Sequence, residues 1–317
     1  MWIPDQPEVN RAFAVLFAER WGVDAATIQH IGDFGNSVYG CQLDGRSVIL
    51  RLTDPKDRSQ PVNQAELDFL AHLGRCGVQV SLPIPSRRGS LIEAGSVGDE
   101  TLLASMFEYA PGVQVTPESP YWREAFFREW GRTLAHIHQA ARAYEPPSDA
   151  RRWQWMDEDL IANARRYIPA SDSASLRELD TVMDHLSRLP TNRDSYGLTH
   201  ADFSYRNFHY DPHSGITAFD FGNCCYHWFI SDIAIALSTL RHYPSSERDQ
   251  YRAWLLAGYR DVFPIDPFLF TQLNWFIRLR ILYVYLDRLA LFGTSPADDQ
   301  RKTLETLRQQ VHECFVW

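Results

Sequence analysis

The spacing of apolar residues predicts a strand-rich first third of the chain. Short alternating runs indicate strands at residues 27–31, 37–43, 47–53, 90–94 and 101–107, and helical spacing indicates helices at 9–22 and 64–74. Asp44-Gly45, between the second and third runs, is a dipeptide strongly favoured in tight hairpin turns. We therefore expect a small lobe built on an antiparallel sheet.

Helical periodicity dominates after Ala110-Pro111-Gly112, which breaks the strand pattern. A strand at 196–199 and a hairpin at 207–220 are the exceptions. The predicted fold class is α+β and bilobal, with a first lobe at residues 1–109 and a larger, mainly helical lobe at 110–317. The expected helices of the second lobe are 118–141, 157–168, 172–188, 229–242, 247–260, 266–292 and 295–315.

Composition narrows the classes of partner. The formal charge of −9 disfavours nucleic acid, because phosphate backbones need a basic surface. The longest apolar stretch, 268–292, contains arginine and aspartate and is a poor membrane span. Five cysteines without CxxC spacing suggest neither a disulfide framework nor a zinc site. Without a signal-like start, the expected location is the cytoplasm.

The candidate chemistry lies in residues 198–223, LTHADFSYRNFHYDPHSGITAFDFGN. If Asp211–Gly215 form the turn of the hairpin, Tyr210 pairs with Ile216 and Asn207 comes close to Asp220. A carboxylate and a carboxamide oxygen make a suitable partial shell for Mg²⁺. Asp202 lies five residues before Asn207 and can accept a proton beside such a site.

This stretch resembles a known family. His200–Asn207 (HADFSYRN) is similar to the HGDxxxxN loop of aminoglycoside phosphotransferases and choline kinases, and Asp220-Phe221-Gly222 matches the kinase DFG element. The resemblance implies a protein-kinase-like fold that uses ATP and Mg²⁺. It implies Asp202 as catalytic base and Asn207 and Asp220 as metal ligands. It also implies that His200 and Asp232 brace the loop.

The first lobe carries a second set of matches. Residues 31–39 resemble the glycine-containing hairpin that covers ATP phosphates, with Gly35, Asn36 and Ser37 at its tip. Arg51 stands where the family has the phosphate-binding lysine, and Glu66 matches the partner of that lysine. Only two of the 31 basic residues, Lys56 and Lys302, are lysine, so the exchange keeps the charge in a chain that avoids lysine.

These features predict an ATP-dependent phosphotransferase acting on a hydroxyl of a small molecule. The lack of HRD and APE elements disfavours a bacterial protein kinase. Arg51 and Ala201 would suit a non-catalytic pseudokinase. The retention of Asp202, Asn207 and Asp220 together disfavours that interpretation. A metal-dependent hydrolase is disfavoured because that function would give the strand-rich lobe no role.

The acceptor remains open between aminoglycosides, choline or ethanolamine, and homoserine-like compounds, several of them cationic. An aromatic cage from Trp153, Trp155, Trp228 and Trp275 would suit a quaternary ammonium, whereas acidic residues 157–159 would suit amines. Core packing and helix capping are the simpler interpretations of these residues.

Overall fold

The computed structural model describes residues 7–33, 36–147 and 151–313, with side chains from Asn10 onward. The chain forms two compact units that are not continuous in sequence. The first unit comprises residues 1–113, 144–152 and 208–222, and the second comprises 114–143, 153–207 and 223–317. The predicted lobe boundary after residue 109 takes no account of the two later segments, and it stays a prediction.

The first unit is a twisted antiparallel sheet with helices and a separate hairpin. Its sheet has the order β1-β2-β3-β6-β4, and β5 also pairs with β6. Its elements are α1 (Pro7–Trp21), η1 (Ala25–Thr27), β1 (Gln29–Asp33), β2 (Ser37–Leu43), β3 (Arg46–Thr53), α2 (Gln60–Arg75), β4 (Pro83–Ile84), β5 (Glu93–Val97), β6 (Glu100–Glu108), β8 (Phe208–Asp211), β9 (Gly215–Ala218) and η3 (Phe221–Asn223).

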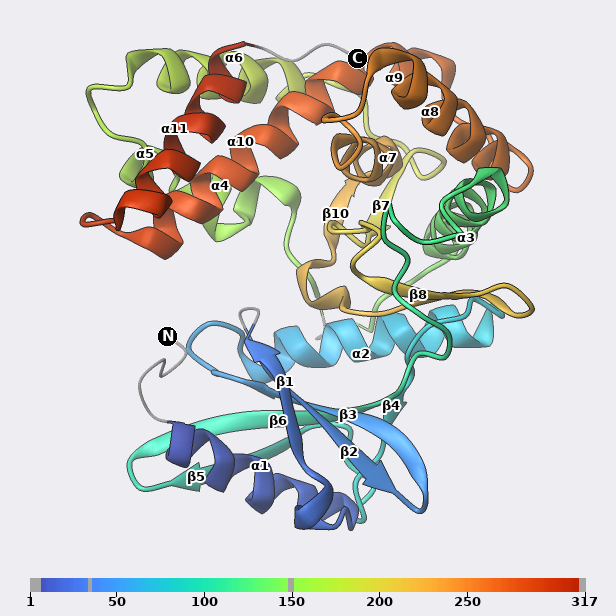
Figure 1. Ribbon diagram of the computed structural model, residues 1–317, viewed down its shortest axis with the longest axis vertical. Helices are drawn as coiled ribbons and strands as arrows, with labels where there is room; N and C mark the ends of the chain where they lie inside the picture. The colour runs from blue at the N-terminus through green and yellow to red at the C-terminus, as the bar shows by residue number, and fades with distance from the viewer. Residues whose placement is uncertain (1–6, 34–35, 148–150, 314–317) are drawn as a thin grey trace. The chain divides into compact units, whose positions relative to one another are not determined.

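Alternation along β3 assigns the two faces of this sheet. Leu50 and Leu52 join a buried cluster that includes Phe13 and Phe17 of α1. Arg51, between them, points to the opposite face and reaches α2. Figure 1 accordingly shows α1 and α2 on opposite sides of the sheet. One face of β3 therefore serves the core, and the other carries a charged residue.

Two hairpins of the first unit confirm the predicted turns. Asp44 and Gly45, between β2 and β3, have φ of 50° and 76°, the left-handed values that a tight primed turn requires. In the β8–β9 hairpin Tyr210 pairs with Ile216, as predicted. The last pair of that ladder is Phe208 with Ala218, so Asn207 directly precedes it and Phe219-Asp220 directly follow it.

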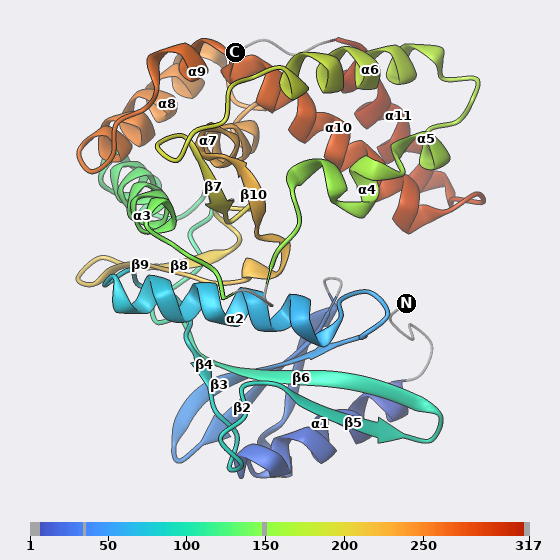
Figure 2. The ribbon, with the colours of Figure 1, turned by 180° about the vertical axis from the view of Figure 1, so that it is seen from behind.

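The second unit is mainly helical. Helix α10 packs against α6, α7 and α11, and α3 packs against α8 (Figure 2). Its elements are α3 (Glu124–Arg142), η2 (Trp155–Asp157), α4 (Asp159–Ala162), α5 (Ala164–Tyr167), α6 (Ser173–Ser187), β7 (Tyr196–Thr199), β10 (Cys225–Trp228), α7 (Phe229–Ser238), α8 (Ser245–Arg260), α9 (Pro267–Thr271), α10 (Leu273–Phe292) and α11 (Asp298–His312).

Local capping divides two of the predicted helices. The expected helix 157–168 is a 3₁₀ turn followed by α4 and α5, because Glu158 caps α4 and Asn163 leaves the helical conformation. The expected helix 266–292 is interrupted at Gln272, between α9 and α10. Strand β10, which pairs with β7, was not predicted. None of the helices in the described ranges is long and apolar enough to cross a bilayer.

Candidate functional site

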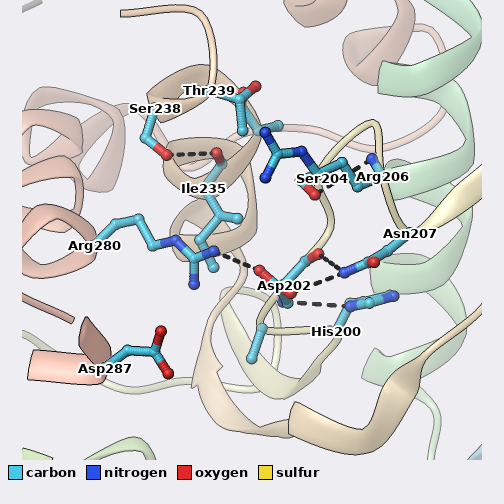
Figure 3. A network of polar contacts seen from close by, with 12 residues as sticks. His200, Asp202, Ser204, Arg206, Asn207, Ile235, Ser238, Thr239, Arg280 and Asp287 are labelled. Atoms are coloured by element: carbon cyan, nitrogen blue, oxygen red, sulfur yellow. Dashed lines mark hydrogen bonds and ion pairs between the residues drawn. The ribbon is translucent and has the colours of Figure 1, made fainter. Parts of the chain in front are cut away.

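Asp202 lies in the loop between β7 and β8, and both of its carboxylate oxygens are bound. Arg280 of α10 donates to Oδ1 over 2.5 Å, and the Asn207 side-chain amide donates to Oδ2 over 2.8 Å. Figure 3 shows these two groups approaching the carboxylate from opposite sides. The side chain of Asp202 remains 26% exposed, so a reactant can still reach it.

Asn207 uses its amide nitrogen entirely within the loop. Besides the bond to the carboxylate, Nδ2 donates to the backbone carbonyl of Asp202 over 2.8 Å. Since the two hydrogens of the amide are thus used, the carbonyl oxygen Oδ1 is left as a neutral hard-oxygen ligand. The orientation of Asn207 therefore suits metal coordination.

A buried aspartate holds the start of this loop. Asp232, fully buried in α7, accepts from the backbone N–H groups of His200 and Ala201 over 2.8 Å each, and from His138 over 3.1 Å. Burial alone would raise the pKa of Asp232, but these hydrogen bonds and the nearby histidines hold it below its usual value. Tyr259 in turn lies 2.8 Å from the other ring nitrogen of His138. The network fixes the backbone that leads into Asp202.

The backbone at Ala201 adopts a conformation that favours glycine. Its φ is 62°, in the left-handed region that disfavours a Cβ atom. The hydrogen bond from its N–H to Asp232 holds it in that conformation. Asp220 also has a φ of 62°, so strained backbone occurs at both predicted site segments.

In the first unit, Arg51 and Glu66 form a buried bidentate pair. The two guanidinium nitrogens donate to the two carboxylate oxygens over 2.7 and 2.9 Å. The guanidinium also lies 4.8 Å from the ring centre of Phe107. Burial would raise the pKa of Glu66, but Arg51, Arg152 and Arg58 hold it below its usual value. Lys56, by contrast, is exposed and lies beside Glu100.

Arg58 and Arg152 bring two further cations to the Asp220-Phe221-Gly222 segment. Arg152 donates to the carbonyl of Gly222 over 2.5 Å and to that of Val62 over 3.1 Å. A Cβ atom on Gly222 would lie 2.4 Å from Arg58 Nη1, so the guanidinium would have to shift to admit a side chain there. Burial lowers the pKa of Arg58, and Arg152 lowers it further. Arg58 and Arg152 therefore place two positive charges beside Asp220, the carboxylate of this segment.

The glycine-loop residues have structural bonds of their own. Asn36 Oδ1 accepts from Thr53 over 2.8 Å, and Ser37 donates to Asp33 over 2.9 Å. Both residues are buried. Gly35, predicted with them, lies outside the described residues. Asn36 and Ser37 thus fix the ends of this hairpin against β3 and β1.

The predicted site residues fall into two groups, one in each unit. Asp202 and Asn207 belong to the second unit, whereas Asn36, Ser37, Arg51, Glu66 and Asp220 belong to the first. Sequence reasoning missed Arg280, Arg58 and Arg152. Their positions in the sequence carry no motif, because each reaches its partner through tertiary packing. Arg280, for instance, is 78 residues from Asp202.

A pocket opens beside the Asp202 loop within the second unit. Its empty space amounts to about 540 Å³, a volume that includes space open to solvent. Aromatic and aliphatic residues form most of its wall. Its lining residues are Trp155, Glu158, Ile161, Ala201, Asn223, Cys225, His227, Ser231, Ile235, Phe276, Leu279, Arg280 and Tyr283.

The candidate aromatic cage is not assembled around one point. Trp155 lines the pocket, but Trp275 stacks on His185, with ring centres 3.9 Å apart, and Trp228 donates its indole N–H to Pro190. Of the acidic residues 157–159, Glu158 lines the pocket and also caps α4. The pocket thus contains one tryptophan and one carboxylate from the two proposed sets.

Comparison with known proteins gives consistent matches. The family model described as "Phosphotransferase enzyme family" matches residues 27–268. Amicoumacin kinase of Bacillus subtilis is 32% identical over 295 residues, covering 90% of this chain and 87% of the relative. Homoserine kinase of Rhizobium rhizogenes is 27% identical, covering 77% of this chain and 74% of the relative.

Solved structures agree on the fold. Amicoumacin kinase hAmiN in complex with AMP-PNP, Ca²⁺ and Ami has a TM-score of 0.88 at 28% identity, covering 96% of this chain and 93% of that one. A microcompartment-associated aminopropanol kinase has a TM-score of 0.80 at 22% identity, covering 96% and 95%. The predicted α+β, kinase-like fold class is confirmed.

Proposed function

The chain belongs to the phosphotransferase enzyme family, and from this membership we propose that it transfers the γ-phosphoryl group of ATP to a hydroxyl of a small molecule that carries an amine. The predicted enzyme class, a small-molecule phosphotransferase, is confirmed by the comparisons. Our proposal concerns the phosphoryl donor, the metal, the acceptor and the roles of the site residues.

Asp202 is the proposed base. Its carboxylate takes the proton of the acceptor hydroxyl as that oxygen bonds to the γ-phosphorus and the bond from the γ-phosphorus to the bridging oxygen of ADP breaks. Arg280 and Asn207 orient the carboxylate, since each binds one of its oxygens. The remaining exposure of Asp202 supports access by the acceptor.

Mg²⁺ is the proposed metal, and Asn207 and Asp220 are its proposed protein ligands. When bound, it would neutralise charge on the phosphates during transfer. The orientation of Asn207, with Oδ1 left as an acceptor, fits this role. Asn207 directly precedes β8, and Asp220 follows β9 after one intervening residue.

Gly35, Asn36, Ser37, Arg51 and Glu66 are the proposed nucleotide-binding residues. Arg51 would take the place of the family lysine, held in position by Glu66. Arg58 and Arg152 add positive charge beside Asp220, which suits a triphosphate. Since ATP is the proposed donor, the proposed location is the cytoplasm.

The acceptor is proposed from the relatives and from the pocket. Amicoumacin and homoserine are the acceptors named for two relatives, and we propose a hydroxyl compound of this kind. Glu158, the carboxylate in the pocket wall, would bind an amine of the acceptor. The location of this pocket beside Asp202 is the observation that carries the proposal.

The proposal is tested by ADP formation from ATP and Mg²⁺ with amicoumacin, homoserine, aminopropanol, choline and an aminoglycoside as acceptors. We expect turnover with at least one of them, and its loss in Asp202→Asn without a change in the circular dichroism spectrum. Full activity in Asp202→Asn would refute the base. Activity only toward protein acceptors would refute the small-molecule assignment.

A further inference from the structure

Ser231 belongs to the pocket wall and has a buried hydroxyl without a partner. The residue is 4% exposed, and its Oγ has no hydrogen-bond partner among the described residues. Burial of a hydroxyl without a partner is unfavourable. The free energy lost here would be recovered if a bound molecule accepted a hydrogen bond from Ser231.

His227 lies in the same wall and provides a second neutral donor. Its Nδ1 accepts the backbone N–H of Trp228 over 2.9 Å, which assigns the ring hydrogen to Nε2. Burial lowers the pKa of His227 to about 3, so the ring is uncharged at neutral pH. The pocket wall thus offers an N–H donor without a fixed charge.

Arg280 provides donors on the side nearest Asp202. It gives one hydrogen bond to Asp202, and the described part of the chain contains no other acceptor for its N–H groups. Most of the remaining wall is apolar, with Trp155, Phe276 and Ile235 as examples. Ser231, His227 and Arg280 therefore supply three hydrogen-bond donors in a mostly apolar wall.

We propose that this pocket binds an acceptor molecule with an apolar ring that bears a hydrogen-bond-accepting oxygen. The ring would pack between the aromatic walls, and its oxygen would accept from Ser231 and His227. The proposal rests on the proposed function, because it describes the acceptor of that same site. It excludes strongly polycationic acceptors from the pocket, which has a single carboxylate in its wall.

Specificity follows from the same donors. A site built to bond an oxygen rejects analogues that lack it, since the buried donors then stay without partners. A ring without the oxygen should therefore bind more weakly than the same ring with it. A straight-chain amino alcohol should depend on neither Ser231 nor His227.

The test is calorimetric binding to the full chain without nucleotide, using amicoumacin, tyramine, phenethylamine and homoserine. We expect tyramine to bind more tightly than phenethylamine, which lacks the ring oxygen. Ser231→Ala should weaken tyramine binding by about tenfold and leave the melting temperature equal or higher. His227→Phe should also weaken tyramine binding, and His227→Gln should retain part of the affinity.

Ser195→Ala is the matched control. Ser195 is also buried with its Oγ unpartnered within the described residues, but it does not line the pocket. Its substitution should leave ligand affinity unchanged. Equal binding by wild type and Ser231→Ala, or equal weakening by both serine variants, would overturn the proposal.

The panel separates this proposal from the proposed function. Binding or turnover of straight-chain compounds alone would overturn the ring-binding pocket and leave the phosphotransferase function intact. If ring compounds bind in a way that depends on Ser231 but no acceptor yields ADP, the phosphotransferase function is overturned and the ring-binding pocket is retained. Failure of every ring compound to bind would also overturn the pocket assignment.

Discussion

The guanidinium of Arg51 bonds both carboxylate oxygens of Glu66, and both residues are buried. Arg51→Lys should lower the free energy of unfolding by about 1–3 kcal/mol, because an ammonium cannot reproduce the two parallel bonds. Arg51→Met, which leaves the buried carboxylate without its cation, should cost about 3–5 kcal/mol. Urea unfolding measures both.

The control for this pair is Arg128, whose bond to Glu124 is exposed on α3. Arg128→Lys should change the free energy of unfolding by less than about 0.5 kcal/mol. Equal losses in the two lysine variants would show that the bidentate geometry of Arg51 contributes nothing specific.

Asp220→Ala and Asn207→Ala should each raise the Mg²⁺ concentration needed for half-maximal nucleotide binding by about tenfold or more, because each removes a proposed oxygen ligand. Fluorescent nucleotide titrated at several Mg²⁺ concentrations measures this. Asp249→Ala, an exposed change on α8, is the control. Unchanged Mg²⁺ dependence in both site variants would refute the proposed ligands.

Arg280→Met should lower kcat by about tenfold to a hundredfold while the protein stays folded, because Asp202 loses the bond that holds Oδ1. Steady-state kinetics with the best acceptor measures this effect. Arg278→Met is a matched change on the same helix, since Arg278 binds Glu178 and not Asp202. It should lower the melting temperature but not kcat; a similar loss of kcat would contradict the orienting role of Arg280.

His227 predicts a pH dependence of stability. Its pKa is about 3 when folded, against about 6.5 when unfolded, so below pH 6.5 the unfolded chain binds a proton that the folded one does not. Stability should therefore fall by about 1.4 kcal/mol per pH unit from this residue as pH drops from 6 toward 4. His227→Gln should remove that part of the slope in urea unfolding; an identical slope would contradict it.

Ala201→Gly should raise the free energy of unfolding by about 0.5–1 kcal/mol. Glycine relieves a left-handed strain of about 1–2 kcal/mol and loses about 0.5–1 kcal/mol to unfolded-chain entropy. Ala234→Gly, a buried helical position in α7, should instead destabilise the protein. Chemical denaturation of the two variants measures the contrast, and destabilisation by both would refute the strain.

Much of the fold could be predicted because its signals are local. The Asp44-Gly45 turn and the register of Tyr210 with Ile216 follow from turn chemistry and counting. The break at Gln272 could not be predicted from apolar spacing, since the pattern continues through it.

For the site, too, local sequence motifs could be predicted, whereas contacts between distant segments could not. The loop from His200 to Asn207 has a recognisable sequence, and so does Asp220-Phe221-Gly222. Arg280 and Arg152 have none, because their roles arise from packing between distant segments. Arginine side chains are long enough that sequence position alone does not identify their partners.

The discontinuity of the first unit constrains how the protein forms during synthesis. Residues 208–222 leave the ribosome about a hundred positions after residue 113, at which the first segment of that unit ends. Until then α2 lacks Arg152 and the Gly222 segment, which bond each other. Domains made early usually fold first. Here the buried cluster between α1 and the sheet can form from the first segment alone, whereas α2 cannot complete its contacts until the later segments have been made.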